Sequence, residues 1–177
     1  MPLCFELLAE PHLELLTEWF ARPHVAAWWG EPPSLSAVRA EYLTPIGEPS
    51  AALPYIAFDD GVPVGYIQSY RAIGSGNGWW ENESDPGVLG IDQFLADEAS
   101  LGKGLGTRMI AAFVEQLLAD PKVTRIQVDP APTNARAIRC YEQVGFERVG
   151  ETTTPDGPAL LMTLRRRRPR PTEPSSP

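Results

Sequence analysis

The sequence contains little of what marks a disulfide-stabilised, metal-binding or membrane protein. It has two cysteines in 177 residues, Cys4 and Cys140, and their separation matches neither a zinc site nor a disulfide framework. No apolar run approaches the ~20 residues that a membrane span needs. The first residues lack a basic region ahead of an apolar stretch, unlike a signal peptide. We therefore expect reduced thiols, no metal, no membrane partner and a cytoplasmic location.

Basic residues are also scarce, and they are unevenly placed. The chain has 15 Lys and Arg against 23 Asp and Glu, and five of the arginines but only one of the acids follow residue 164. Residues 1–164 thus carry 10 basic and 22 acidic side chains, a net charge of −12. An acidic body disfavours nucleic acid as a partner and attracts cations. The composition equally fits acids that only keep the protein soluble.

Length and composition predict one folded domain, residues 1–164, and a disordered Arg/Pro-rich tail, residues 165–177, which lacks apolar side chains. A hairpin turn is expected at Asp59-Asp60-Gly61. The strand, helix, strand order within residues 88–129 predicts a parallel crossover in a mixed sheet. The expected strands are 3–8, 52–58, 62–70, 88–96, 123–129, 146–150 and 158–164, and the expected helices are 11–20, 35–43, 103–119 and 134–144, with a loop between the first two helices.

The strongest local motif is LGKGLGT, residues 101–107, between an expected strand and the most periodic helix. Its three glycines let the backbone approach a ligand closely, and the first helical turn presents free N–H groups and a positive dipole end. Such a turn suits a pyrophosphate. The spacing differs from the dinucleotide and Walker fingerprints, and taken alone it also fits a glycine-rich helix start without a ligand.

A second motif follows the next strand. Residues 134–146, NARAIRCYEQVGF, place Asn134, Ala137, Tyr141 and Gly145-Phe146 in order. Together the two motifs resemble the GCN5-related N-acetyltransferase (GNAT) superfamily, although Leu101 stands where that family usually has Arg or Gln. The runs GSGNGWW, DPGVLGIDQFLA and TTPDGPA extend the resemblance, over about residues 3–164, to the aminoglycoside 6′-N-acetyltransferases of the Ib type.

The resemblance implies an α/β fold with a mixed, mostly antiparallel, V-split sheet flanked by helices. Acetyl-CoA, the cosubstrate, would lie where two parallel strands diverge. The strand would contribute backbone groups and the glycine turn would hold the pyrophosphate. The cofactor-binding residues implied in this way are Phe94, Leu95, Gly102, Lys103, Gly104, Leu105, Gly106, Thr107 and Asn134.

The family's substrate residues fall mainly on acids and aromatics. Asp92 lies inside an apolar strand, where an unpartnered carboxylate is costly to bury, unless it simply faces solvent. Aspartates are also ordinary at strand ends and turns, and tryptophan pairs often pack in cores. Asn77 stands where Ib-type members have a substrate-binding Asp, so we expect weaker binding of some aminoglycosides. The implied substrate-binding residues are Trp29, Tyr42, Asn77, Trp79, Asp92, Asp129 and Asp156.

The implied activity is acetyl transfer from acetyl-CoA to the 6′-amino group of aminoglycosides, conferring antibiotic resistance. The amine must attack as a neutral base, and we expect Asp92 to accept its proton. A backbone N–H near Phe94 would stabilise the oxyanion, and Tyr141 would protonate the thiolate unless it only packs. Cys140 has no histidine nearby in the sequence, which favours direct transfer in a ternary complex.

Other functions stay open at this point. The same chemistry on a siderophore-precursor lysine or a polyamine is the nearest alternative, and a non-catalytic binding protein is another. Fluoroquinolone acetylation is not expected, because Ib variants with that activity have Arg and Tyr where this chain has Trp79 and Asp156. We expect a monomer or weak dimer.

Overall fold

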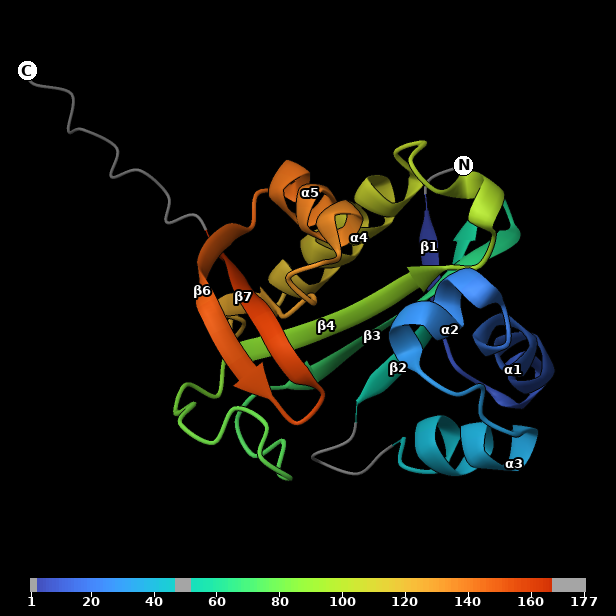
Figure 1. Ribbon diagram of the computed structural model, residues 1–177, viewed down its shortest axis with the longest axis horizontal. Helices are drawn as coiled ribbons and strands as arrows, with labels where there is room; N and C mark the ends of the chain where they lie inside the picture. The colour runs from blue at the N-terminus through green and yellow to red at the C-terminus, as the bar shows by residue number, and fades with distance from the viewer. Residues whose placement is uncertain (1–2, 47–51, 167–177) are drawn as a thin grey trace, which may run out of the picture.

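A seven-stranded sheet forms the centre of the molecule (Figure 1). The structure is a computed structural model that describes residues 3–46 and 52–166. The strands are β1 (Cys4–Leu7), β2 (Leu53–Asp59), β3 (Val62–Arg71), β4 (Val88–Leu95), β5 (Arg125–Val128), β6 (Glu147–Thr154) and β7 (Gly157–Arg165). Their order across the sheet is β1-β2-β3-β4-β5-β7-β6.

Within the described residues, five α-helices lie against this sheet. They are α1 (Leu13–Phe20), α2 (Pro23–Trp29), α3 (Leu35–Val38), α4 (Leu105–Leu118) and α5 (Ala135–Val144). A π-helical turn, Arg39–Leu43, continues α3, and single 3-10 turns occupy Glu10–His12 and Glu98–Ser100. The Ser34 hydroxyl accepts a hydrogen bond from the N–H of Ala37 and caps α3, as its sequence position predicts.

Every neighbouring strand pair is antiparallel except β4 and β5. The β2–β3 hairpin turns at Asp60 and Gly61, both with positive φ, which confirms the turn expected from Asp-Gly. The long helix α4 connects β4 to β5 and makes the parallel crossover. The mixed, mostly antiparallel sheet expected from the sequence is therefore confirmed.

The two parallel strands separate after a short common run. Val88, Leu89 and Gly90 pair with Arg125, Ile126 and Gln127, and no β5 partner follows for Ile91–Leu95. On its other edge β4 stays paired with β3 along its length. The sheet is thus split at its middle, and the C-terminal half of β4 has one edge free of strand partners.

The two faces of the sheet have different covers (Figure 1). Helices α1 to α3 cover one face and share an apolar cluster with Ile56, Tyr66 and Phe94. Helix α4 covers the other face, where Ile110 and Phe113 belong to the cluster that contains Ile67 and Ile91. This arrangement leaves the split between α2 on one side and α4 with α5 on the other.

The structure differs from the sequence expectations at a helix before residue 35 and at the start of the expected tail, besides shifts in the ends of several elements. The expected loop before residue 35 contains a helix, α2, which has no apolar periodicity long enough to predict it. Strand β7 extends to Arg165, one residue into the expected tail, and the guanidinium of Arg166 hydrogen bonds to the Val123 carbonyl. The rest of the expected disordered tail, residues 167–177, lies outside the described residues.

Residues 3–46 and 52–166 contain neither a candidate membrane-spanning helix nor a candidate metal site. No helix there has the length and apolar character to cross a membrane. No group of three or more His, Cys, Asp or Glu in that part of the chain is arranged to hold a metal ion.

Candidate active site

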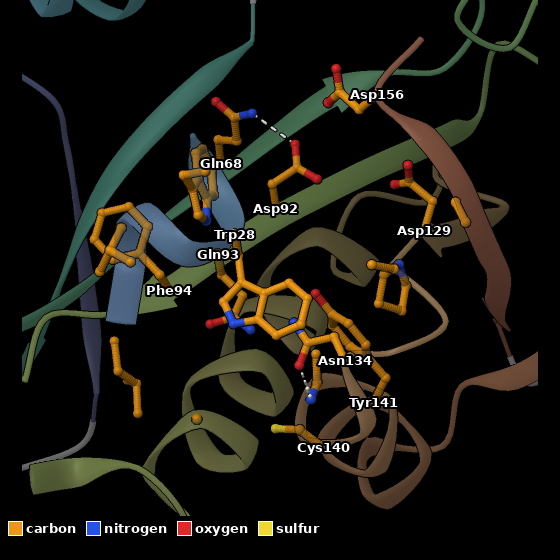
Figure 2. Close-up of a pocket in the computed structure, with 18 of the residues that line it drawn as sticks. Trp28, Gln68, Asp92, Gln93, Phe94, Asp129, Asn134, Cys140, Tyr141 and Asp156 are labelled. Carbon is orange, nitrogen blue, oxygen red and sulfur yellow. Dashed lines mark hydrogen bonds between the residues drawn. The ribbon is translucent and has the colours of Figure 1, made fainter. Parts of the chain in front are cut away.

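A cavity of about 1100 Å³ follows the split in the sheet. At one end its wall contains the carboxylates of Asp92, Asp129 and Asp156, and at the other it contains the glycine turn before α4 and the start of α5. Figure 2 shows Asp92, Asp129 and Tyr141 around one space, with the Trp28 indole lying across it. Segments that are distant in the sequence therefore form one continuous site.

Asp92 lies on β4 and points into this cavity (Figure 2). Its Oδ2 accepts a hydrogen bond of 2.8 Å from Nε2 of Gln68, the cross-strand neighbour on β3. The Gln68 amide is oriented in turn, because its Oε1 accepts a 2.6 Å bond from the Tyr66 hydroxyl. Burial raises the pKa of Asp92, the Gln68 bond lowers it, and Asp156 raises it further. Asp92 is thus a fixed carboxylate whose basicity is increased.

Asp129 lies directly after β5, on the opposite side of the split from Asp92. Burial raises the pKa of Asp129 to about 7, with further contributions from the charges of Asp92 and Asp156. Asp156 is placed by the tight turn between β6 and β7. Three carboxylates in one cavity repel one another, and a cationic ligand would relieve that repulsion.

Tyr141 is positioned by α5, whose N-cap residue is Asn134. The Asn134 side chain caps this helix by accepting a 3.1 Å hydrogen bond from the N–H of Ala137. Tyr141 is buried and packs edge-on against Phe146, with ring centroids 5.5 Å apart. Burial raises its pKa, the Asp92 charge raises it further, and a hydrogen bond with Gln93 lowers it. The phenol therefore keeps its proton at neutral pH and can donate it.

The free edge of β4 directs backbone groups into the split. The N–H of Ala96 donates to the carbonyl of Val64, and the carbonyl of Val88 accepts from the N–H of Ala72. The backbone N–H and C=O groups of the even-numbered residues of β4 therefore point toward β3. Because backbone groups alternate along a strand, the N–H groups of Gln93 and Leu95 face the split. Nε2 of His24 lies 2.9 Å from the Leu95 carbonyl oxygen.

The glycine turn is open to a ligand. Gly102 and Gly104 have φ values of 72° and 83°, and a Cβ added at either position would have no heavy atom within 4 Å. Gly104 directly precedes the first residue of α4, where free N–H groups gather. Side chains do not plug this helix end, so the turn has the shape that a pyrophosphate needs.

The cofactor residues expected from the sequence fall into two groups. Those that line the cavity are Phe94, Leu95, Gly102, Gly104, Gly106, Thr107 and Asn134. Lys103 and Leu105 do not line it: Lys103 is exposed, and Leu105 packs against the small cluster of Ala57, Leu95 and Met109. Two arginines of α5, Arg136 and Arg139, line the cavity and were not predicted. They can supply positive charge near the turn.

Every substrate residue expected from the sequence lines the same cavity. Trp29 also packs within the core, with its ring 5.3 Å from Phe94 and 5.7 Å from Tyr66. Tyr42 stacks on Phe20 at 5.4 Å. The further cavity residues Trp28, Glu41, Gln68, Tyr70 and Gln93 were missed. Alternation along β3 would have placed Gln68 and Tyr70 on one face, but only the strand pairing puts them opposite Asp92 and Gly90.

A split mixed sheet, an open glycine turn at a helix start, and a free strand edge beside carboxylates are together typical of an acyltransferase that uses a CoA thioester. The sequence comparison agrees with this class, because residues 9–154 match the domain family described as Acetyltransferase (GNAT) domain. The chain belongs to the GNAT acetyltransferases and, within them, to the aminoglycoside 6′-N-acetyltransferases.

Similarity to individual proteins covers most of the chain. It is 54% identical over 163 residues to aminoglycoside N(6')-acetyltransferase type 1 of Klebsiella pneumoniae, which covers 90% of this chain and 81% of the relative. A crystal structure of AAC(6')-Ib with coenzyme A and kanamycin superposes with a TM-score of 0.89 at 53% identity, covering 93% of this chain and 95% of that one. The lysine N-acyltransferase MbtK of Mycobacterium tuberculosis is 30% identical over 152 residues, which is 85% of this chain and 71% of the relative.

Proposed function

We propose that this protein transfers the acetyl group of acetyl-CoA directly to the 6′-amino group of an aminoglycoside bound in the same cavity, and so confers resistance. One observation carries the proposal: four carboxylates and several aromatic rings line a cavity that is continuous with the open glycine turn before α4. Carboxylates attract the ammonium groups of a polycationic sugar, and aromatic faces complement sugar rings.

The residues at the other end fit acetyl-CoA. The N–H groups at the start of α4 and the Gly102–Gly106 backbone would hold its diphosphate, which the positive end of the helix dipole stabilises. The free edge of β4 would pair with its amide-containing arm. The N–H groups of Gln93 and Leu95 would then donate to the thioester oxygen as negative charge develops on it.

Asp92 is the group suited to take the proton of the attacking amine. A substrate ammonium among carboxylates holds its proton tightly, so an acceptor is needed within hydrogen-bond reach or through one water. The raised pKa of Asp92 makes it a stronger base than an ordinary aspartate, and Gln68 keeps its Oδ2 oriented. Direct attack then joins the nitrogen to the acetyl carbon, and the carbon–sulfur bond breaks.

Tyr141 is suited to protonate the departing thiolate, because burial keeps its hydroxyl neutral. Cys140 is a poor candidate for a covalent acetyl carrier. Burial raises the pKa of its thiol, and its Sγ contacts the hydroxyl of Thr107 at 3.2 Å, which is no base. This arrangement supports direct transfer.

The catalytic unit would be contained in one domain. The cavity residues lie between His24 and Ala159, and strand β7 ends at Arg165. These bounds support one catalytic domain that ends near residue 164, and we expect that domain to be a monomer or a weak dimer.

A thiol-release assay tests the function. With acetyl-CoA we expect turnover of kanamycin and not of lysine or spermidine. Asp92→Asn should lower kcat by about 100-fold or more with little change in the KM for acetyl-CoA, and Tyr141→Phe should lower kcat by about tenfold. Glu147→Gln, an exposed substitution on β6, is the control. Turnover of lysine with none of any aminoglycoside would overturn the substrate assignment.

A further inference from the structure

The loop between β3 and β4, residues 72–87, forms one wall of the substrate end of the cavity through Asn77 and Trp79. We call it the tryptophan loop. Its second half is fixed to the neighbouring strand, because Glu83 pairs with Arg125 and Asp85 accepts a 2.7 Å bond from the Thr124 hydroxyl. The first half carries the cavity residues Ser75, Asn77 and Trp79, and the Ser75 hydroxyl donates to the carbonyls of Arg71 and Ala72 at its start.

The segment from Gly74 to Trp80 contains several residues in the left-handed backbone conformation. Gly74, Gly76 and Gly78 have positive φ, and so do Asn77 at 54° and Trp80 at 47°. Asparagine tolerates this conformation, but a bulky residue such as tryptophan adopts it only where its surroundings hold it there. Trp80 is therefore the point at which the loop needs an anchor.

The structure provides one contact of this kind. Nε1 of Trp80 donates a 3.3 Å hydrogen bond to the hydroxyl of Tyr70, the penultimate residue of β3. The indoles of Trp79 and Trp80 lie 6.0 Å apart at 47°, so the position of one constrains the other. Through this contact β3 reaches the segment that turns Asn77 and Trp79 into the cavity.

Tyr70 is itself held in place by a glycine. Gly90 is its cross-strand partner on β4, and a Cβ added at Gly90 would lie 2.1 Å from Cζ of Tyr70 and 2.4 Å from its hydroxyl oxygen. The hydroxyl end of the Tyr70 ring thus lies over Gly90, in space that the side chain of any other residue would fill. Glycine is required at position 90 for this reason, although its φ is ordinary.

We propose that Tyr70 is a positioning residue: seated over Gly90, its hydroxyl holds Trp80 and thereby fixes Asn77 and Trp79 in the wall of the substrate cavity. This rests on the proposed aminoglycoside site. The cross-strand pair Gln68 and Asp92, two residues along from Tyr70 and Gly90, lies on the same face of the sheet as Tyr70. Strands β3 and β4 thus position both the proposed proton acceptor, through Gln68 and Asp92, and the cavity wall, through Tyr70 and Gly90.

Kinetics of Tyr70→Phe test the proposal, since this change removes the hydroxyl and keeps the ring. We expect the KM for kanamycin to rise about fivefold, the loss of one net hydrogen bond, with the KM for acetyl-CoA unchanged. In a Trp80→Phe background the same substitution should add less than about a twofold effect, because its partner is already gone. Equal effects in both backgrounds, or a fall in kcat alone, would show that Tyr70 acts on the substrate directly and would overturn the proposal.

Hydrogen exchange supplies a readout that does not depend on turnover. Tyr70→Phe should accelerate exchange of amides in the tryptophan loop, whereas Tyr55→Phe, which changes a tyrosine packed on Phe113 across the sheet, should not. Unchanged exchange in the loop would refute the anchoring. Faster exchange in a protein that acetylates no aminoglycoside would refute the proposed function and leave the anchoring intact.

Discussion

The pKa of Asp129 is strongly affected by burial and by the neighbouring carboxylates of the cavity. Its carboxyl is largely buried near two other carboxylates, and these surroundings raise its pKa from 3.8 to about 7. A raised carboxyl pKa means that the folded protein prefers the neutral form. The stabilisation from that form is fully present below the unfolded pKa and is lost as the pH rises through the folded pKa.

The substitution Asp129→Asn should therefore stabilise the protein without substrate at high pH. We expect it to raise the free energy of unfolding at pH 8 by on the order of 2 kcal/mol, less than the full shift would give because the site admits water. The advantage should shrink between pH 7 and pH 4. Urea unfolding of both proteins at four pH values measures it, and a difference that stays constant with pH would contradict the assignment.

The residue scale is also where sequence patterns were least complete. The three aspartates were identifiable because a carboxylate in an apolar strand, at a strand end and in a turn matched a known family. Gln68 and Tyr70 were not, because nothing in the letters around them differs from an ordinary alternating strand. Their roles come from the register that sets them opposite Asp92 and Gly90.

At the scale of single elements, the start of α4 is the feature on which the proposed mode of cofactor binding depends. The expected helix began at residue 103, and the structure begins it at Leu105, after two glycines with positive φ. Helix ends are hard to place from periodicity because the first turn has no apolar face of its own. The turn itself was predicted correctly, since its glycine spacing is a local property.

A glycine substitution separates backbone strain from ligand contact at this turn. Gly104→Ala should raise the KM for acetyl-CoA by about tenfold or more, because the methyl group enters the space left for phosphate and the left-handed conformation is strained. Gly61→Ala is a matched control: Gly61 has a φ of 78° against 83° for Gly104, and an added Cβ at either has no atom within 4 Å.

Both variants should lose similar stability, while only Gly104→Ala should change the KM for acetyl-CoA. Thermal unfolding and steady-state kinetics on the two proteins measure these effects. Equal KM values for the two variants would mean that the turn does not contact the diphosphate.

Helix α2 is an element that the sequence pattern did not predict. It has seven residues, starts at Pro23 and buries only Val25. So short a helix is not stable by itself, and its stability comes from tertiary contacts. One of these is the contact of His24 with the Leu95 carbonyl, which links α2 to the free edge of β4.

At the scale of the whole molecule, charge is the property with a direct consequence. The net charge of −8 favours the approach of a polycationic substrate and opposes that of an anionic cosubstrate. We propose that Arg136 and Arg139, which line the cavity, offset this repulsion locally. Such long-range attraction is screened within about 10 Å at 0.1 M salt.

Raising NaCl from 50 to 500 mM should therefore raise the KM for kanamycin by about fivefold or more, whereas the KM for acetyl-CoA should change less. Initial rates at four salt concentrations, with the other substrate saturating, give both values. A kanamycin KM that is independent of salt would show that short-range contacts alone hold the substrate.

The sequence by itself determined the order of the main elements, the hairpin turn, the glycine turn and the family, because each depends on neighbouring residues or on a pattern read along the chain. Only the tertiary structure decided where β4 and β5 separate, that Tyr70 lies over Gly90, and that α2 forms beside the split. Those features arise from contacts between residues distant in the chain, whose geometry is set by strand register and packing. The same contacts bring Asp92, Asp129 and Asp156 to one cavity and raise the pKa values of the first two.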